Sequence, residues 1–206
     1  MTRFAISGAD YMLTMDDARR ELRGADIVVE QGQIVSVGEA LANGLPSVNA
    51  AGCVVTPGLV NTHHHLYQTL TRAVPMGQDA LLFGWLQALY PIWARFTPDH
   101  MYTSAQIGLA ELALSGCSLS SDHLYLFPNG TRLEDTIQAA AEVGLRFQPT
   151  RGAMSIGVSD GGLPPDGLVE READILDDCI RVIDQFHDAS AASMCRVGIA
   201  PCSPFS

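Results

Sequence analysis

Three consecutive histidines, His63, His64 and His65, follow a short apolar run that begins after Pro57 and Gly58. Side chains alternate between the two faces of a β-strand, so His63 and His65 are expected to point one way and His64 the other. Two neutral imidazoles on one face suit a Zn²⁺ or Fe²⁺ ion. A surface triplet of histidines is the alternative, but such a triplet has no reason to end a buried strand. The pattern therefore predicts a metal-binding pair formed by His63 and His65.

Strands and helices alternate along the chain after Pro57. The strands are expected at residues 59–65, 118–123, 145–150 and 197–200. The helices are expected at residues 82–93, from an N-cap at Thr97 to Gly116, from a capping box at Thr131 to Gly144, and at residues 168–186, with a loop at 155–167. This alternation predicts parallel β/α units. Because a closed (β/α)8 barrel needs eight strands, residues 57–206 are predicted to form its first half.

The residues before Pro57 have a different pattern of short strands and turns. Residues 25–30 and 34–38 are two β-rich runs around a turn that contains Gly32, which predicts a hairpin. Val48 and residues 53–55 suggest further short strands. Residues 1–56 are therefore predicted to form a small β-domain.

Charge and cysteine usage limit the partners and the compartment. The 206 residues carry 12 Lys and Arg against 23 Asp and Glu, a formal net charge of -11, which argues against nucleic acid or an acidic membrane surface as a partner. The five cysteines are scattered and odd in number, as is usual in a reducing compartment. We expect neither a signal peptide nor a membrane-spanning segment, and a cytoplasmic location.

The run from Val55 to His65, VTPGLVNTHHH, resembles the first barrel strand of the amidohydrolase superfamily, in its branch of chlorohydrolases and cytosine- and guanine-type deaminases. Four further segments resemble the 8-oxoguanine deaminases in particular: THHHLYQTLTRAVP, LFGWLQALYPIWA, SSDHLYLFPN and APCSPFS. The resemblance covers essentially the whole chain. It implies an α/β fold, namely the N-terminal half of a (β/α)8 amidohydrolase barrel preceded by a small β-sandwich segment.

The resemblance also implies roles for individual residues. His63 and His65 correspond to the two first-strand ligands of one divalent metal ion, zinc foremost and iron as the alternative. Five residues correspond to substrate-binding positions: Gln68, Trp85, His123, Cys202 and Ser203. Four of these five also have a purely structural interpretation. Gln68 can be an ordinary polar residue at a helix start, Trp85 a core residue, Cys202 an inert buried thiol, and Asp122-His123 a structural hydrogen-bonding unit.

The reaction implied is hydrolytic deamination of an amino-substituted heterocycle, with 8-oxoguanine giving urate and ammonia. Triazines, guanine and pterins are the competing small-molecule substrates. The family places further ligands and catalytic residues on its fifth, sixth and eighth strands, whereas Ser206 follows the fourth predicted strand. No catalytic residue is therefore assigned here, and a non-catalytic truncated fragment remains an alternative. Barrels of this family usually form homo-oligomers, which we expect for the full-length protein.

Overall fold

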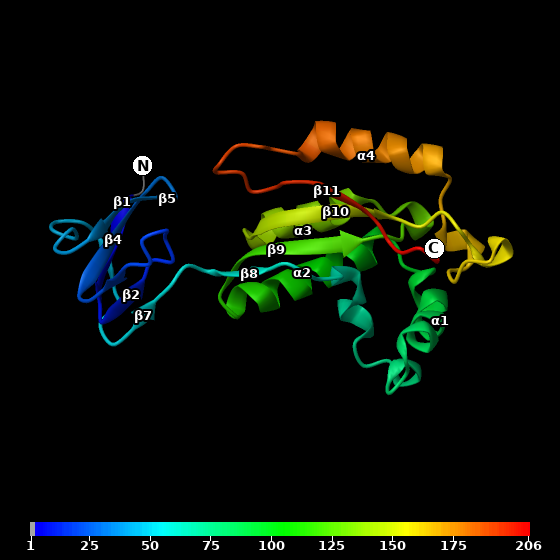
Figure 1. Ribbon diagram of the computed structural model, residues 1–206, viewed down its shortest axis with the longest axis horizontal. Helices are drawn as coiled ribbons and strands as arrows, with labels where there is room; N and C mark the ends of the chain where they lie inside the picture. The colour runs from blue at the N-terminus through cyan, green and yellow to red at the C-terminus, as the bar shows by residue number, and fades with distance from the viewer. Residues whose placement is uncertain (1–2) are drawn as a thin grey trace. The chain divides into compact units, whose positions relative to one another are not determined.

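The structure of the protein is a computed structural model that describes residues 3–206. The chain contains two compact units, residues 1–58 and residues 59–206, and Figure 1 shows the elements of each. Within residues 3–206, no helix combines the length and the apolar character needed to cross a membrane.

The first unit consists of two small β-sheets. One sheet has the strand order β5-β4-β1-β6 and the other has the order β3-β2-β7. Their strands are β1 (Arg3–Ala9), β2 (Tyr11–Leu13), β3 (Glu21–Leu22), β4 (Ala25–Glu30), β5 (Gln33–Gly38), β6 (Ser47–Asn49) and β7 (Val54–Val55). Both sheets contribute to one buried cluster, formed by Ala9, Met12, Ala25, Ile27 and Ala50.

The hairpin predicted from the sequence is confirmed. Strands β4 and β5 pair antiparallel, with Glu30 opposite Gln33. The two residues between them have positive φ angles, 52° at Gln31 and 78° at Gly32. This left-handed backbone at both turn positions matches the twist of the flanking strands, and glycine adopts it at little cost.

The second unit is built on a curled four-stranded sheet in which every pair is parallel (Figure 1). Its strand order is β11-β10-β9-β8, from β8 (Leu59–Asn61), β9 (Cys117–Leu124), β10 (Arg146–Ala153) and β11 (Gly198–Pro201). Each strand pairs with the next along the chain, as expected for successive right-handed β/α units. These are half the strands of a (β/α)8 barrel.

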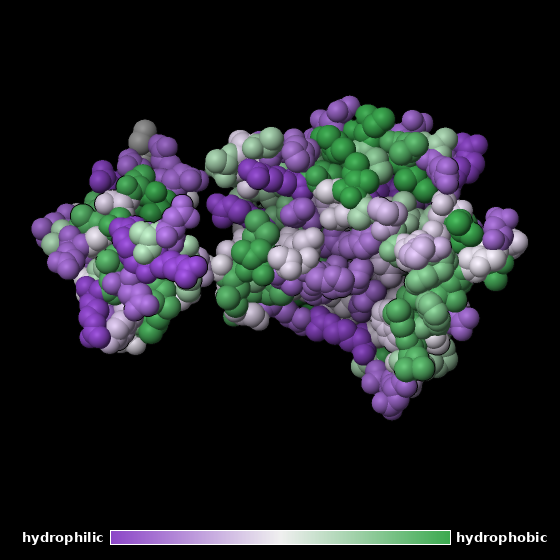
Figure 2. All heavy atoms as spheres, in the orientation of Figure 1, coloured by the Kyte–Doolittle hydropathy of each residue, from purple (hydrophilic) through white to green (hydrophobic). Residues whose placement is uncertain are grey.

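Four α-helices connect and cover the strands of this sheet. They are α1 (Leu82–Trp93), α2 (Pro98–Leu114), α3 (Leu133–Val143) and α4 (Glu172–Phe186), and short 3-10 helices include η1 (Leu66–Thr71). Thr97 is the N-cap of α2 with Pro98 at its first position, as predicted. Gly144 ends α3 with a left-handed φ of 80°. Figure 2 shows hydrophobic residues over α4, where Leu176 and Ile180 are exposed.

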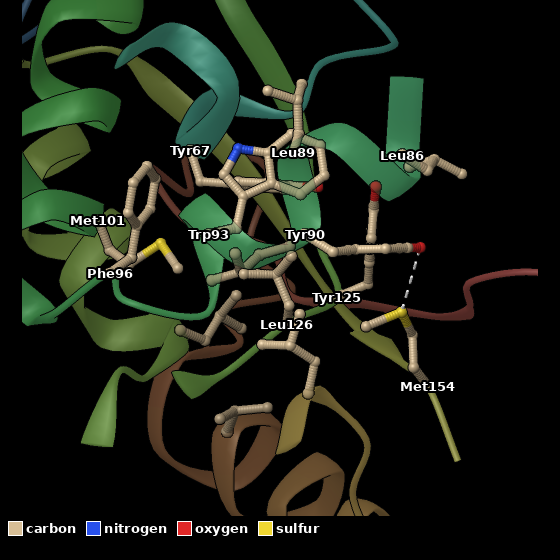
Figure 3. Packing of buried hydrophobic residues seen from close by; sticks show 14 of the residues in the cluster. Tyr67, Leu86, Leu89, Tyr90, Trp93, Phe96, Met101, Tyr125, Leu126 and Met154 are labelled. Atoms are coloured by element: carbon tan, nitrogen blue, oxygen red, sulfur yellow. Dashed lines mark hydrogen bonds between the residues drawn. The ribbon is translucent and has the colours of Figure 1, made fainter. Parts of the chain in front are cut away.

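A cluster of aromatic and aliphatic side chains forms the core beside the ends of the strands (Figure 3). Trp93 is completely buried, and its indole N–H donates to the Thr71 hydroxyl at 3.1 Å. The Tyr90 hydroxyl donates to the sulfur of Met154 at 3.9 Å, which is the dashed line in Figure 3. The polar ends of these large side chains are thus satisfied inside the core.

Several predicted boundaries were wrong. The first strand ends at Asn61, and not at His65. The third helix takes Arg132 as its N-cap, one residue after Thr131, because the Arg132 N–H donates to Asp135 at 2.8 Å. The fourth helix begins at Glu172, because residues 166–168 form a separate 3-10 turn, and the preceding loop holds another such turn at residues 158–160.

Candidate metal and substrate site

The three histidines lie just beyond β8, where the chain continues beside β9. The His123 N–H donates to the His64 carbonyl oxygen at 2.8 Å, which keeps this segment next to the neighbouring strand. The rings of His63 and His65 lie side by side, with centroids 5.0 Å apart and planes at 88° to each other. The two imidazoles predicted to share a face are therefore adjacent, although the strand itself ends earlier than predicted.

A hydrogen bond to the backbone defines which nitrogen of His65 carries a proton. The Nδ1 atom lies 2.8 Å from the His123 carbonyl oxygen. Because a carbonyl oxygen only accepts, Nδ1 must be the donor, and Nε2 then presents its lone pair. Burial lowers the pKa of His65; the bond to His123 opposes this shift and the nearby His63 adds to it. Burial and His63 favour the neutral imidazole, and the bond to His123 leaves its Nε2 free, which is the form that binds a metal ion.

His64 faces a different part of the molecule. Its Cε1 atom is 4.0 Å from the position that a Cβ at Gly108 on α2 would occupy. Together with Thr69 and Arg72, it lines a hollow between η1 and α2 that His63, His65 and Gln68 also line, whereas the pocket described next has His63 and His65 in its lining and not His64. Burial lowers the pKa of His64, with smaller contributions from His65 and Arg72.

One pocket of about 360 Å³ contains every residue that the sequence analysis assigned to the site. The contributing segments are the residues after β8, helix α1, the end of β9 and the residues after β11. The seven predicted residues in its lining are His63, His65, Gln68, Trp85, His123, Cys202 and Ser203. Residues far apart in the sequence, such as His63 and Ser203, thus meet at one end of the parallel sheet.

Aromatic residues that the sequence analysis did not assign form another part of the wall. Tyr125 lies with its ring centroid 5.3 Å from that of His65 and 5.2 Å from that of His123. Burial raises the pKa of Tyr125 to about 12, so its hydroxyl keeps its proton at neutral pH. Tyr90 lines the same pocket. The available signal for Tyr125 was its position two residues after His123, which places both on one face of an extended chain.

The donors present fit part of a metal site. Within residues 3–206, no group of three or more His, Cys, Asp or Glu side chains is arranged to hold a metal ion. Catalytic zinc sites usually have three protein ligands and one open position. His63 and His65, adjacent and with the His65 tautomer set by the backbone, are suited to supply two of those ligands.

Comparison with known proteins gives the family. The Amidohydrolase family matches residues 54–206 of the chain. The chain is also 46% identical over 186 residues to the 8-oxoguanine deaminase of Pseudomonas aeruginosa, an alignment that covers 87% of this chain and 41% of that protein. The chain therefore belongs to the amidohydrolase family, as its first-strand motif and its parallel α/β sheet indicated.

Other relatives have related activities in their names. The chain is 34% identical to the hydroxydechloroatrazine ethylaminohydrolase of Pseudomonas sp. strain ADP, over 99% of this chain and 46% of that protein. Among solved structures, it superimposes with a TM-score of 0.90 and 31% identity on an atrazine chlorohydrolase from Arthrobacter aurescens TC1 complexed with zinc, covering 98% of this chain and 48% of the other. The chain thus spans less than half the length of these relatives.

Proposed function

We propose that the full-length protein carrying this chain is a metal-dependent hydrolytic deaminase that converts 8-oxoguanine to urate and ammonia. The observation that carries the proposal is the pocket in which the adjacent His63 and His65 meet Gln68 and an aromatic wall. The 46% identity to an 8-oxoguanine deaminase supports the choice of substrate. Because the chain spans less than half the length of its relatives, the roles below concern binding and positioning.

His63 and His65 are the proposed ligands of one divalent ion, zinc foremost, with iron as the alternative. When bound, such an ion would lower the pKa of a coordinated water so that hydroxide is available near neutral pH. The part played by this chain is to hold the two imidazoles neutral and correctly turned. The His65–His123 backbone bond does this for one of them, since it commits Nδ1 and leaves Nε2 for the metal.

Gln68 is the proposed contact to the edge of the heterocycle. Its Nε2 donates to the Tyr67 hydroxyl at 3.1 Å, which fixes the orientation of the amide. A carboxamide has one acceptor oxygen and two donor hydrogens, so besides its bond to Tyr67 the Gln68 side chain is of a type that can both accept from and donate to a ring. This combination matches the alternating N–H and C=O groups of an oxopurine better than the edge of a chlorinated or alkylamino-triazine.

The remaining assigned residues would enclose the ring. Trp85 is half-buried and lines the pocket while its ring packs edge-on against Trp93 at 5.3 Å, so it serves the core and the site together. Burial raises the pKa of the Cys202 thiol, which therefore stays protonated and able to donate a weak hydrogen bond. Ser203 and His123 add polar groups at the rim.

A triazine is the second candidate substrate. The 34% identity to a hydroxydechloroatrazine ethylaminohydrolase and a TM-score of 0.93 with a triazine hydrolase variant favour it. Guanine and pterins are further candidates within the same chemistry. A chain without catalytic activity is the remaining alternative.

Ammonia release from a panel of substrates by the full-length protein tests the proposal. We expect kcat/KM for 8-oxoguanine to exceed the values for cytosine and for hydroxylated triazines by at least about 100-fold, because a site built to pair a ring edge rejects rings that lack it. A preference for a triazine would overturn the substrate assignment. Absence of ammonia release from every compound in the panel would overturn the activity.

A matched pair of variants tests the role of Gln68. Gln68→Ala removes a hydrogen-bonding group in a partly buried pocket and should lower kcat/KM by about 10- to 100-fold. Gln106→Ala is the control, since Gln106 on α2 makes the same type of bond, to the Tyr102 hydroxyl at 3.0 Å, and does not line the pocket. Equal effects of the two variants would show that Gln68 has no special role at the substrate.

A further inference from the structure

The end of β9 holds residues 64–66 in place through three hydrogen bonds. The His123 N–H donates to the His64 carbonyl at 2.8 Å, and the His65 ring donates from Nδ1 to the His123 carbonyl at 2.8 Å. The third bond comes from a side chain: the Leu66 N–H donates to Oδ1 of Asp122 at 2.7 Å. Two of these bonds are backbone features of any residue at position 123, whereas the third requires the residue type at position 122.

Asp122 is placed where a carboxyl group is costly. The residue is 0% exposed. Within residues 3–206, the side chain makes a single hydrogen bond, to Leu66, and Oδ2 has no partner. Burying a carboxyl group with one oxygen unpaired costs free energy that an apolar residue at the same position would not cost. The bond to the Leu66 N–H is the one interaction of this side chain that offsets the cost.

The Leu66 N–H is the first amide of η1, and amides at this position of a helix have no partner within the helix. A side chain at the preceding N-cap usually accepts such an N–H, but the N-cap here is His65, which makes no capping bond. Its ring is already committed to the backbone of β9. Asp122 therefore supplies, from the neighbouring strand, the cap that a metal-binding histidine at this position cannot supply.

We propose that Asp122 is a positioning residue for the metal and substrate site. By fixing the Leu66 N–H, it sets the direction of the His65 side chain and the start of the η1 turn that carries Gln68. This inference rests on the proposed function, because it gives His65 the role of a ligand. Asp122 itself does not line the pocket. It acts only through the segment of residues 65–68, whose turn is closed by the Gln68 N–H to His65 carbonyl bond of 3.0 Å.

Variants of the full-length protein at this position separate positioning from general stability. Asp122→Asn keeps an oxygen that can accept the Leu66 N–H, whereas Asp122→Leu has the same branched shape, with larger methyl groups in place of the oxygens, and lacks the acceptor. Thr136→Val is the matched control, since Thr136 is also completely buried and its hydroxyl also bonds to the backbone, at Leu133 with 2.9 Å, on a helix that does not line the pocket. All three variants, and Asp122→Ala in case Asp122→Leu does not fold, are compared with wild type.

The primary measurement is the dissociation constant for Zn²⁺, obtained by competition with a chromogenic chelator. Residues that orient a metal ligand typically change metal affinity by about 10- to 100-fold when replaced. We therefore expect Asp122→Leu or Asp122→Ala to weaken Zn²⁺ binding by about 10-fold or more. Asp122→Asn and Thr136→Val should stay within about 3-fold of wild type, because the first keeps an acceptor for the Leu66 N–H and the second lies on a helix that does not line the pocket. The visible spectrum of the Co²⁺-substituted proteins should change only in Asp122→Leu or Asp122→Ala.

The outcomes are distinguishable from failure of the proposed function. Zn²⁺ affinity in Asp122→Leu and Asp122→Ala equal to that of Thr136→Val would overturn the positioning role while leaving the metal site in place. A loss in Asp122→Asn as large as in Asp122→Leu would also overturn it, because the acceptor is then not the feature that matters. A wild-type protein that binds no divalent ion would overturn the ligand assignment of His63 and His65, and the positioning role with it.

Discussion

Replacement of Arg151 by methionine should destabilise the second unit strongly, although the residue lies outside the proposed site. The Arg151 side chain on β10 is only 1% exposed. Its guanidinium donates to both carboxylate oxygens of Glu170, at 2.8 and 2.9 Å, and to Asp178 on α4 at 2.8 Å. It also lies over the ring of Phe127, 3.9 Å from the centroid. One buried cation thus ties the sheet to α4 and to the loop that precedes that helix.

The size of the effect follows from what methionine leaves behind. Methionine keeps the length and the apolar stem of the side chain, so the loss is mainly that of the ion pairs. Removing one partner of a buried ion pair costs about 3–5 kcal/mol, because the other charge is left uncompensated. Glu170 and Asp178 are about a quarter exposed (26% and 25%), and Asp178 keeps a second partner in Arg181. These two facts place the expected loss near the lower end, about 3 kcal/mol.

Urea unfolding of wild type and variants at neutral pH measures this loss directly. Arg171→Met is the control, because Arg171 pairs with Asp174 at the start of the same helix but is 81% exposed. Exposed pairs of this kind are screened by water and contribute little, so the control should unfold with the wild-type midpoint. An Arg151→Met protein that also keeps the wild-type midpoint would refute the reasoning that burial gives this ion pair its weight.

Three further predictions concern other parts of the second unit. In Gly152→Ala, the new Cβ would lie 2.5 Å from Nε2 of His123 and would displace the ring. Calorimetry should therefore show a loss of stability of about 1–3 kcal/mol, and kcat/KM should fall. Unchanged stability and kcat/KM would contradict this prediction. Burial raises the pKa of Asp122 to about 7, so the folded protein binds this proton more tightly than the unfolded chain does. As the pH rises from about 4 to about 7, wild type should therefore lose stability relative to Asp122→Asn, by at most about 4 kcal/mol. Parallel pH profiles of the two proteins would contradict this prediction. Thr97→Ala removes the N-cap side chain of α2 and should lower the free energy of unfolding by about 1 kcal/mol, measured with urea. An unchanged free energy of unfolding would show that the cap does not stabilise the helix.

The sequence predicted features that depend on local periodicity. The spacing of His63 and His65 was enough to place two imidazoles together, because alternation along an extended chain continues past the last ladder bond of β8. The alternation of strands and helices likewise predicted the parallel sheet. Because the strands are parallel, the residues that follow β8 and β11 lie at the same end of the sheet, and His63 and Cys202 line one pocket.

Features that depend on packing were not accessible in the same way. By residue type, Thr131 with Glu134 fits the capping-box pattern better than Arg132 with Asp135, yet α3 begins at Leu133, which is completely buried. The buried charge of Arg151 has partners 19 and 27 residues away, in a loop and on a helix. Only the three-dimensional arrangement of these elements shows that the ion pairs form.

The central claim is that His63 and His65, and not His64, bind a metal ion in the pocket. The most direct test is the metal content of the full-length protein, measured by inductively coupled plasma mass spectrometry. Wild type and His64→Asn should each contain about one divalent ion per chain, whereas His63→Ala and His65→Ala should contain almost none. Full metal content in His63→Ala, or loss of metal in His64→Asn equal to that in His65→Ala, would contradict the account.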